Sequence, residues 1–215
     1  MKKQSGFTLI ELMIGMLVGL IVLSAVLYAF LSTLRSSSDL LNGARLNREV
    51  SALSDIIVGE MRRVGYWPIT GEGDSPFGTS PDLKLIGSNC VLYSYFNDSN
   101  PTALGAQIFR GIASEDGVFY IGELASDALS STSCDPSADG WAELADSNIV
   151  SGALKLSLNC IDVKSPSTAV ASCETATDKT YSRSMQIGID AEIIIDPSWS
   201  SEVTETVKLQ NDLSD

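Results

Sequence analysis

One carboxylate near the start of the chain lies where a charge is costly. Glu11 lies in the otherwise apolar run from Phe7 to Leu31 and is the only charged side chain in that run. A charge in a bilayer segment costs about 2.5–3.5 kcal/mol on insertion scales. Such a group is tolerated when it pairs with an opposite charge or extends to the polar interface. The sequence therefore predicts one of these two arrangements for Glu11.

Histidine is absent from the sequence. Its absence excludes serine and cysteine nucleophiles that depend on a histidine base, and it excludes histidine-ligated zinc sites. The acidic residues of the second half are dispersed among Ser, Asn and Gly, as they are in solvated loops. We therefore expect no enzymatic activity and no cofactor.

One acidic loop carries oxygen ligands at the spacing of a calcium-binding loop. The segment DPSADGWAELAD fills positions 1, 3, 5, 6 and 12 of that template with Asp135, Ser137, Asp139, Gly140 and Asp146. Alternate oxygens around a glycine turn suit a hard cation. Against this, Asp146 replaces the usual bidentate glutamate, Pro136 restricts the backbone, and no helix pair flanks the loop. A plain acidic loop is the favoured interpretation, and calcium is the alternative.

The four cysteines all follow the apolar run, and none forms a C-x-x-C pair; they are Cys90, Cys134, Cys160 and Cys173. This spacing argues against a zinc ribbon or a thioredoxin-like redox site. Four cysteines allow three pairings. In an oxidising compartment we favour Cys160–Cys173, which are close in sequence, and Cys90–Cys134 as the second bridge. Free buried thiols are the alternative.

Charge is distributed unevenly along the chain. Residues 1–64 contain seven Lys or Arg and five Asp or Glu, a net charge of +2, whereas the remainder contains seven and 22, a net charge of −15. Affinity for nucleic acid comes largely from Lys and Arg on phosphates. We therefore expect no direct binding of nucleic acid by the acidic part, whose charge is best explained as a solubilising surface.

The run from Phe7 to Leu31 predicts a membrane-spanning helix. As a helix it would extend about 38 Å, enough to cross the hydrocarbon core. Lys2 and Lys3 precede it, which predicts a cytoplasmic N-terminus with the rest of the chain on the other side of the membrane. Gly15 and Gly19 form a G-x-x-x-G pattern that permits close helix packing.

The helical pattern continues beyond the membrane segment as far as Val64. Apolar residues recur at spacings of three, four, five or seven, namely Leu34, Leu41, Leu46, Val50, Leu53, Ile57, Met61 and Val64. Proline is absent before Pro68, and the segment from Gly65 onward is rich in residues that break helices. The sequence therefore predicts one long helix whose second half is amphipathic and packs against a domain.

The rest of the chain has the alternation and turn residues of antiparallel strands. Strands are predicted within residues 90–96, 106–112, 117–124, 153–163, 181–196 and 203–210. We expect six to eight strands in an antiparallel sheet, with the apolar stripe of the helix covering one face. The predicted fold is α+β, with a long N-terminal helix packed on a β-rich head.

The N-terminal string KKQSGFTLIEL resembles the class III signal and first helix of type IV pilins and pseudopilins. In that family a prepilin peptidase cuts between glycine and phenylalanine, which correspond here to Gly6 and Phe7, and N-methylates the new terminus. The resemblance also implies that Glu11 pairs with the Phe7 amine of a neighbouring subunit, so that subunits enter a filament in register.

Four segments follow from the resemblance and the patterns together. They are a leader at 1–6, a transmembrane and filament-core helix at 7–31, an amphipathic continuation at 32–64 and a β-rich globular head at 65–215. The implied location is the inner membrane with a periplasmic head, and later a pilus at the cell surface.

Within this superfamily the helix end resembles that of PilW-type minor pilins, through Arg62, Arg63, Gly65 and Tyr66. The terminal VTETVKLQNDL resembles their last strand, although Gln210 stands where an arginine is frequent. The resemblance implies a minor pilin that helps to initiate a pilus, with other minor pilins, pilus subunits, the peptidase and a tip adhesin as partners. A J-like minor pseudopilin of type II secretion and a membrane-tethered ligand-binding domain are the alternatives.

Overall fold

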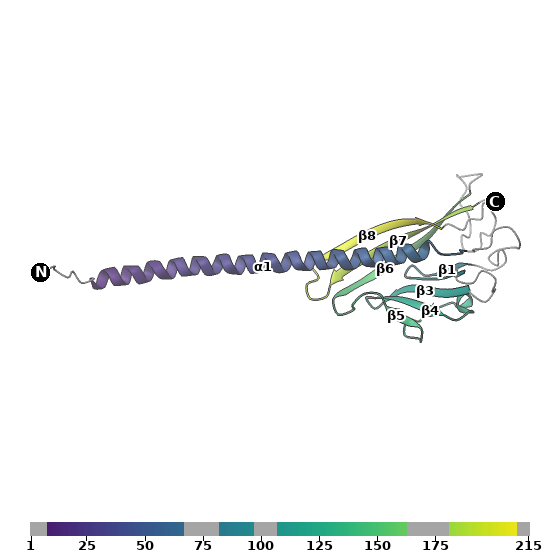
Figure 1. Cartoon of the computed structure of the whole chain (residues 1–215), viewed down its shortest axis with the longest axis horizontal. Coiled ribbons are helices and arrows are strands. Elements are labelled where there is room, and N and C mark those ends of the chain that lie inside the picture. Colours follow the sequence, from purple (N-terminus) through teal and green to yellow (C-terminus); the bar gives the residue numbers. More distant parts are fainter. Residues whose placement is uncertain (1–7, 67–81, 97–106, 163–180, 210–215) are drawn as a thin grey trace. The chain divides into compact units, whose positions relative to one another are not determined.

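The computed structural model describes residues 8–66, 82–96, 107–162 and 181–209. One long helix, α1, runs from Leu9 to Met61 (Figure 1). The chain divides into two units, Met1–Ala44 and Arg45–Asp215, so that the last part of α1 belongs to the compact head unit. The predicted α+β fold and long helix are confirmed.

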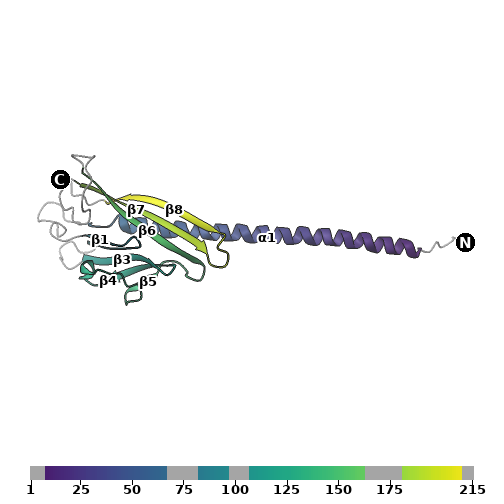
Figure 2. The same cartoon turned by 180° about the vertical axis from the view of Figure 1, so that it is seen from behind.

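The described residues of the head form two antiparallel sheets, whereas the sequence predicted one. The first sheet has the order β1-β2-β3-β4-β5, with β1 (Leu83–Ile86), β2 (Cys90–Phe96), β3 (Gln107–Glu115), β4 (Val118–Leu124) and β5 (Trp141–Glu143). The second has the order β6-β7-β8, with β6 (Val150–Asp162), β7 (Tyr181–Ile193) and β8 (Ser200–Lys208). Figure 2 shows both sheets from behind. Six strands were located from the sequence within a predicted total of six to eight; the short β1 and β5 were not located.

The core of the head lies between the last part of α1 and the inner faces of both sheets. Helix residues at three- and four-residue spacing are at most 2% exposed, namely Leu46, Val50, Leu53, Ile57, Met61 and, after the helix, Val64. They pack in one cluster with Val91, Tyr93 and Ile112 of the first sheet and Leu154, Met185, Ile187 and Ile189 of the second. The predicted amphipathic stripe is therefore the surface on which both sheets pack.

The stripe begins later than the sequence predicted. Leu34 is 50% exposed and Leu41 is 71% exposed, although both continue the same helical spacing. Both residues precede Arg45, where the compact head unit begins. Their inclusion in the head-covering stripe was wrong, because helical spacing reports which face is apolar and not what covers it.

Backbone hydrogen bonds join β6 to the turns of the first sheet. The N–H of Gly152 donates to the carbonyl of Gly117 at 2.8 Å, and that of Leu156 donates to the carbonyl of Ser88 at 2.6 Å. Between them, the N–H of Leu154 donates to the Ser114 hydroxyl at 2.9 Å. The two sheets are thus connected by polar contacts as well as by the core.

The burial of the stripe yields a test of the fold. Ile57 is 0% exposed and its neighbour Ile56 is 41% exposed. Ile57→Ala should lower the free energy of unfolding by about 2–5 kcal/mol, because it leaves a cavity between the helix and the sheets. Ile56→Ala, the matched control, should change it by less than about 1 kcal/mol. Thermal unfolding of the full chain in detergent measures both; equal effects would contradict this packing.

Candidate functional site

Glu11 is held at the start of α1 by its own chain. The backbone N–H and the hydroxyl of Thr8 donate to Glu11 Oε2 at 3.0 and 2.9 Å, and the N–H of Glu11 lies 3.4 Å from Thr8 Oγ1. This is a capping box, in which the residue before the helix and the residue three positions later satisfy each other's backbone donors. The T-x-x-E spacing carries that signal, and our sequence analysis did not use it.

The predicted partners of Glu11 are not part of this geometry. Gly6 and Phe7 lie outside the described residues, so the cleavage site and the pairing of Glu11 with a neighbouring Phe7 amine stay predictions. The carboxylate already accepts hydrogen bonds within its own chain. Because a carboxylate has about four acceptor sites, these two hydrogen bonds orient Glu11 without excluding a partner amine.

The first unit of the chain exposes apolar side chains all around α1. Between Leu9 and Leu31 its large apolar residues are 52–79% exposed. By length and composition α1 can cross a membrane. Apolar surface of this extent requires lipid or other helices as its surroundings. A Cβ added at Gly15 or Gly19 would meet nothing within 4 Å, so the helix surface there is open, and their packing role stays a prediction.

The disulfides lie in the head. Cys90 at the start of β2 is bonded to Cys134, with the two Cα atoms 6.5 Å apart, which is the second bridge that the sequence analysis favoured. This bond attaches the segment between β4 and β5 to the first sheet. Cys160 is also disulfide-bonded. Its predicted partner, Cys173, lies outside the described residues.

The candidate calcium loop uses its oxygens in local turns. Asp135 accepts from the N–H of Ser137 at 3.1 Å, and Asp146 accepts from the N–H of Asn148 at 3.0 Å. That backbone hydrogen bond is the main cause that lowers the pKa of Asp146. Strand β5 intervenes between the positions of Asp139 and Asp146. No group of three or more Cys, Asp or Glu side chains in the described part of the chain could hold a metal. These oxygens are therefore used in local turns, and calcium binding stays an untested alternative.

A partly buried polar cluster, which sequence patterns did not predict, connects the end of α1 to the first sheet. We define the Glu60 cluster as Glu60, Arg63, Tyr93 and Arg110. The Tyr93 hydroxyl donates to Glu60 Oε2 at 2.8 Å and Arg63 donates to Oε1 at 3.0 Å, while Arg110 lies 3.4 Å from the same oxygen. Burial, followed by the charge of Glu60, raises the pKa of Tyr93 well above its usual value. The cluster holds the last helical turn against β2 and β3.

A second buried ion pair connects the segment before β1 to β7. The guanidinium of Arg183 donates to both carboxylate oxygens of Asp82, at 2.8 and 2.6 Å. Their side chains are only 7% and 6% exposed. Because these residues are 101 positions apart, no local sequence pattern reveals the pair. It links the two sheets across the head.

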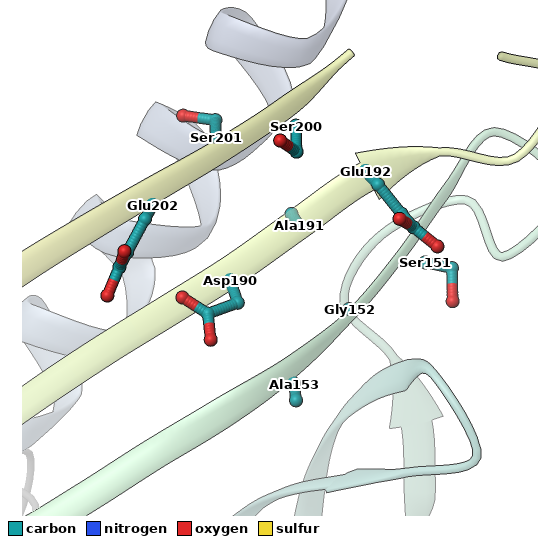
Figure 3. Close-up of a pocket in the computed structure, with 9 residues that line it drawn as sticks. All are labelled: Ser151, Gly152, Ala153, Asp190, Ala191, Glu192, Ser200, Ser201 and Glu202. Carbon is teal, nitrogen blue, oxygen red and sulfur yellow. The ribbon is translucent and has the colours of Figure 1, made fainter. Parts of the chain in front are cut away.

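The outer face of β6, β7 and β8 contains an acidic depression of about 420 Å³. Figure 3 shows its three carboxylates, Asp190, Glu192 and Glu202, on adjacent strands. Asp190 pairs with Lys155, and this contact is the main cause that raises the pKa of Lys155. The remaining lining residues are small: Ser151, Gly152, Ala153, Ala191, Ser200 and Ser201. The depression is therefore an acidic feature of the head surface.

An apolar helix of membrane length, capped through a glutamate and followed by a β-rich head, defines a type IV pilin-like protein. The prokaryotic N-terminal methylation motif matches residues 1–27. The family model of Prepilin peptidase-dependent protein B matches residues 39–209, which is most of the chain. The chain belongs to the Prepilin peptidase-dependent protein B family. No curated protein and no solved structure matches it significantly.

Membership of this family has direct consequences. Dependence on prepilin peptidase supports processing of the chain by that peptidase and a context of pilus or pseudopilus. The apolar helix together with the methylation motif is consistent with membrane anchoring followed by incorporation into a pilus. Pilin-like families are structural and not enzymatic.

The Glu60 cluster can be tested through its tyrosine. Tyr93→Phe removes one hydrogen bond to a buried carboxylate and should cost about 1–3 kcal/mol of stability. Tyr120→Phe, on β4, leaves all contacts of Glu60 intact and serves as the control. Urea unfolding of the full chain in detergent compares the two, and equal stabilities would show that the hydrogen bond contributes nothing.

The Asp82–Arg183 pair should be far more sensitive than the exposed pair Lys155–Asp190. Asp82→Ala should destabilise the head by about 3–5 kcal/mol, because it leaves a buried guanidinium without its carboxylate. Lys155→Ala should cost less than about 1 kcal/mol, because solvent screens a pair whose lysine is 63% exposed. Melting temperatures in detergent provide the comparison. A cost for Asp82→Ala as small as that for Lys155→Ala would refute the structural role of the buried pair.

Proposed function

We propose that this chain is a minor pilin of a type IV pilus, which helps to initiate assembly within a complex of minor pilins at or near the tip. The observation that supports this most is the part of α1 from Leu9 to Leu31, which exposes apolar side chains on every face and has Glu11 as its single charge. Such a surface suits both states of a pilin, because lipid surrounds it before assembly and neighbouring helices surround it afterwards. In this proposal the head resides in the periplasm before assembly and at the cell surface afterwards.

Processing would create the charge that Glu11 requires. Removal of residues 1–6 leaves an amine on Phe7, one position before Thr8. A charge-assisted hydrogen bond is roughly twice as strong as a neutral one, and low dielectric strengthens it further. The amine of a neighbouring subunit can therefore bind the Glu11 carboxylate strongly while Thr8 still donates to it. The pairing would set the axial position of the incoming subunit.

The motif that carried the PilW resemblance has a structural role that fits this proposal. Arg63 belongs to the Glu60 cluster, and Gly65, with φ of 69°, donates to the carbonyl of Ser94 at 2.9 Å. Tyr66 accepts from the N–H of Phe96 at 3.0 Å. A left-handed φ favours glycine at the end of a helix. The motif therefore connects the filament helix firmly to the head, which a subunit that positions other subunits requires.

The proposed partners are other minor pilins, further pilus subunits, prepilin peptidase and a tip adhesin. A J-like pseudopilin of type II secretion would share the helix and the head, and a membrane-tethered ligand-binding domain would share the anchor. The minor-pilin proposal and these two alternatives predict different phenotypes when Glu11 is substituted or the chain is deleted.

The decisive test compares Glu11→Ala with Glu11→Gln in the native host. Glutamine retains a capping side chain at this position but removes the charge, whereas alanine removes both. If the charge drives assembly, both variants should lose surface pili and co-purification with other minor pilins, while the processed protein persists in the membrane. Electron microscopy of pili and affinity purification provide the readouts.

Other outcomes distinguish the alternatives. Normal pili with both variants would contradict the assembly role of Glu11. Normal pili together with defective type II secretion in a deletion strain would identify a pseudopilin. A deletion that affects neither process would favour a tethered binding domain.

A further inference from the structure

The turn between β7 and β8 presents two isoleucines to solvent. Ile194 is 44% exposed and Ile195 is 85% exposed, the highest value among the large apolar residues of the described head. Exposed apolar side chains that are held in place on a surface are typical of protein contacts.

Hydrogen bonds fix the backbone of this turn. The N–H of Ile194 donates to the carbonyl of Ile149 at 3.1 Å, and that of Ile193 donates to the carbonyl of Trp199 at 3.1 Å. Within the turn, the N–H of Ser198 donates to the Asp196 carboxylate at 3.2 Å. The two isoleucines are therefore presented on an ordered turn, and an ordered contact surface loses little conformational entropy on binding.

The surroundings of the turn are acidic. Asp196 lies within it, and Glu192 and Ser200, on the strands that flank it, line the acidic depression (Figure 3). The head as a whole has a strong negative charge, since residues 65–215 contain 22 acidic and seven basic residues. Two such heads repel each other. A partner for this turn should therefore be apolar and basic.

The chain itself contains a surface of that chemistry. Between residues 32 and 49 the helix carries Arg35, Arg45 and Arg48 against Asp39 and Glu49; Glu49 pairs with Arg48 at 3.7 Å, so Arg35 and Arg45 supply the positive charge. In this part of α1, Leu34, Leu40 and Leu41 are 50%, 71% and 71% exposed. Leu34 and Leu41 are seven positions apart, so they lie on one face, about 10 Å from each other. Arg35 adjoins this face.

We propose that the β7–β8 turn of this subunit docks on the segment of α1 just beyond the membrane span of a neighbouring pilin-type subunit. Ile194 and Ile195 contact the leucine face of that helix, and Glu192 and Asp196 face its arginines. The inference rests on the proposed function, because it requires subunits that assemble side by side. Anionic lipid is a poor occupant, because its charge has the same sign as that of the turn.

Site-specific photo-crosslinking in the native host tests this contact. A photoreactive phenylalanine analogue replaces Ile195 in the full chain, and mass spectrometry identifies the crosslinked peptide. The matched control carries the analogue at Ile161, which is 50% exposed on β6. We expect crosslinks from position 195, and none from position 161, to a pilin-type helix just beyond its apolar half. Crosslinks to lipid, to another head or to nothing would overturn the proposal.

A pair of variants tests whether the contact contributes to assembly. The double substitution Ile194→Ser and Ile195→Ser should abolish the crosslinked complex and reduce surface pili, without lowering the melting temperature of the head. Ile161→Ser should leave pili unchanged. Normal pili in the double variant, in a host whose pili are lost on deletion of the chain, would refute the docking inference alone. Normal pili after deletion would refute the proposed function, while a helix crosslink would still support docking within a pseudopilus.

Discussion

A single helix that must satisfy two different surroundings determines the rest of this structure. Every backbone group inside α1 bonds to another within the helix, so the helix can pass from lipid into water without a break. Its side chains change where its surroundings change. Up to Leu31 they are apolar on all faces, and from Leu46 onward only one face is buried. The two sheets of the head cover that face.

The polar clusters explain how the head stays attached to the helix end. The apolar stripe is buried against both sheets, but apolar contact alone is not directional. The Glu60 cluster and the Gly65–Ser94 hydrogen bond fix the last turn of the helix against β2. The Asp82–Arg183 pair then connects the first sheet to β7. A force along α1 would thus reach both sheets through hydrogen bonds and ion pairs whose geometry is fixed.

Patterns within a short stretch of sequence predicted the helix and most strands. They did not predict strand pairing or contacts between residues that are far apart in the sequence. Helical spacing identified Leu46 to Met61, and alternation identified β6 and β7, because each pattern reports one buried face. Alternation does not reveal which strands pair, so the division into two sheets was missed. The Glu60 cluster joins residues up to 50 positions apart, so no local window contains it.

The capping box shows how the Glu11 carboxylate is oriented, which the pilin resemblance alone does not imply. In the unprocessed chain the nitrogen of Phe7 is a neutral amide, and Thr8 already supplies hydrogen bonds to the carboxylate. An unprocessed neighbour therefore offers no charge to pair with Glu11. Cleavage creates the amine, and only then does a charged partner exist. If the proposed pairing holds, Thr8 orients the carboxylate and only a cleaved subunit supplies its charged partner, so that assembly depends on processing through the chemistry of one carboxylate.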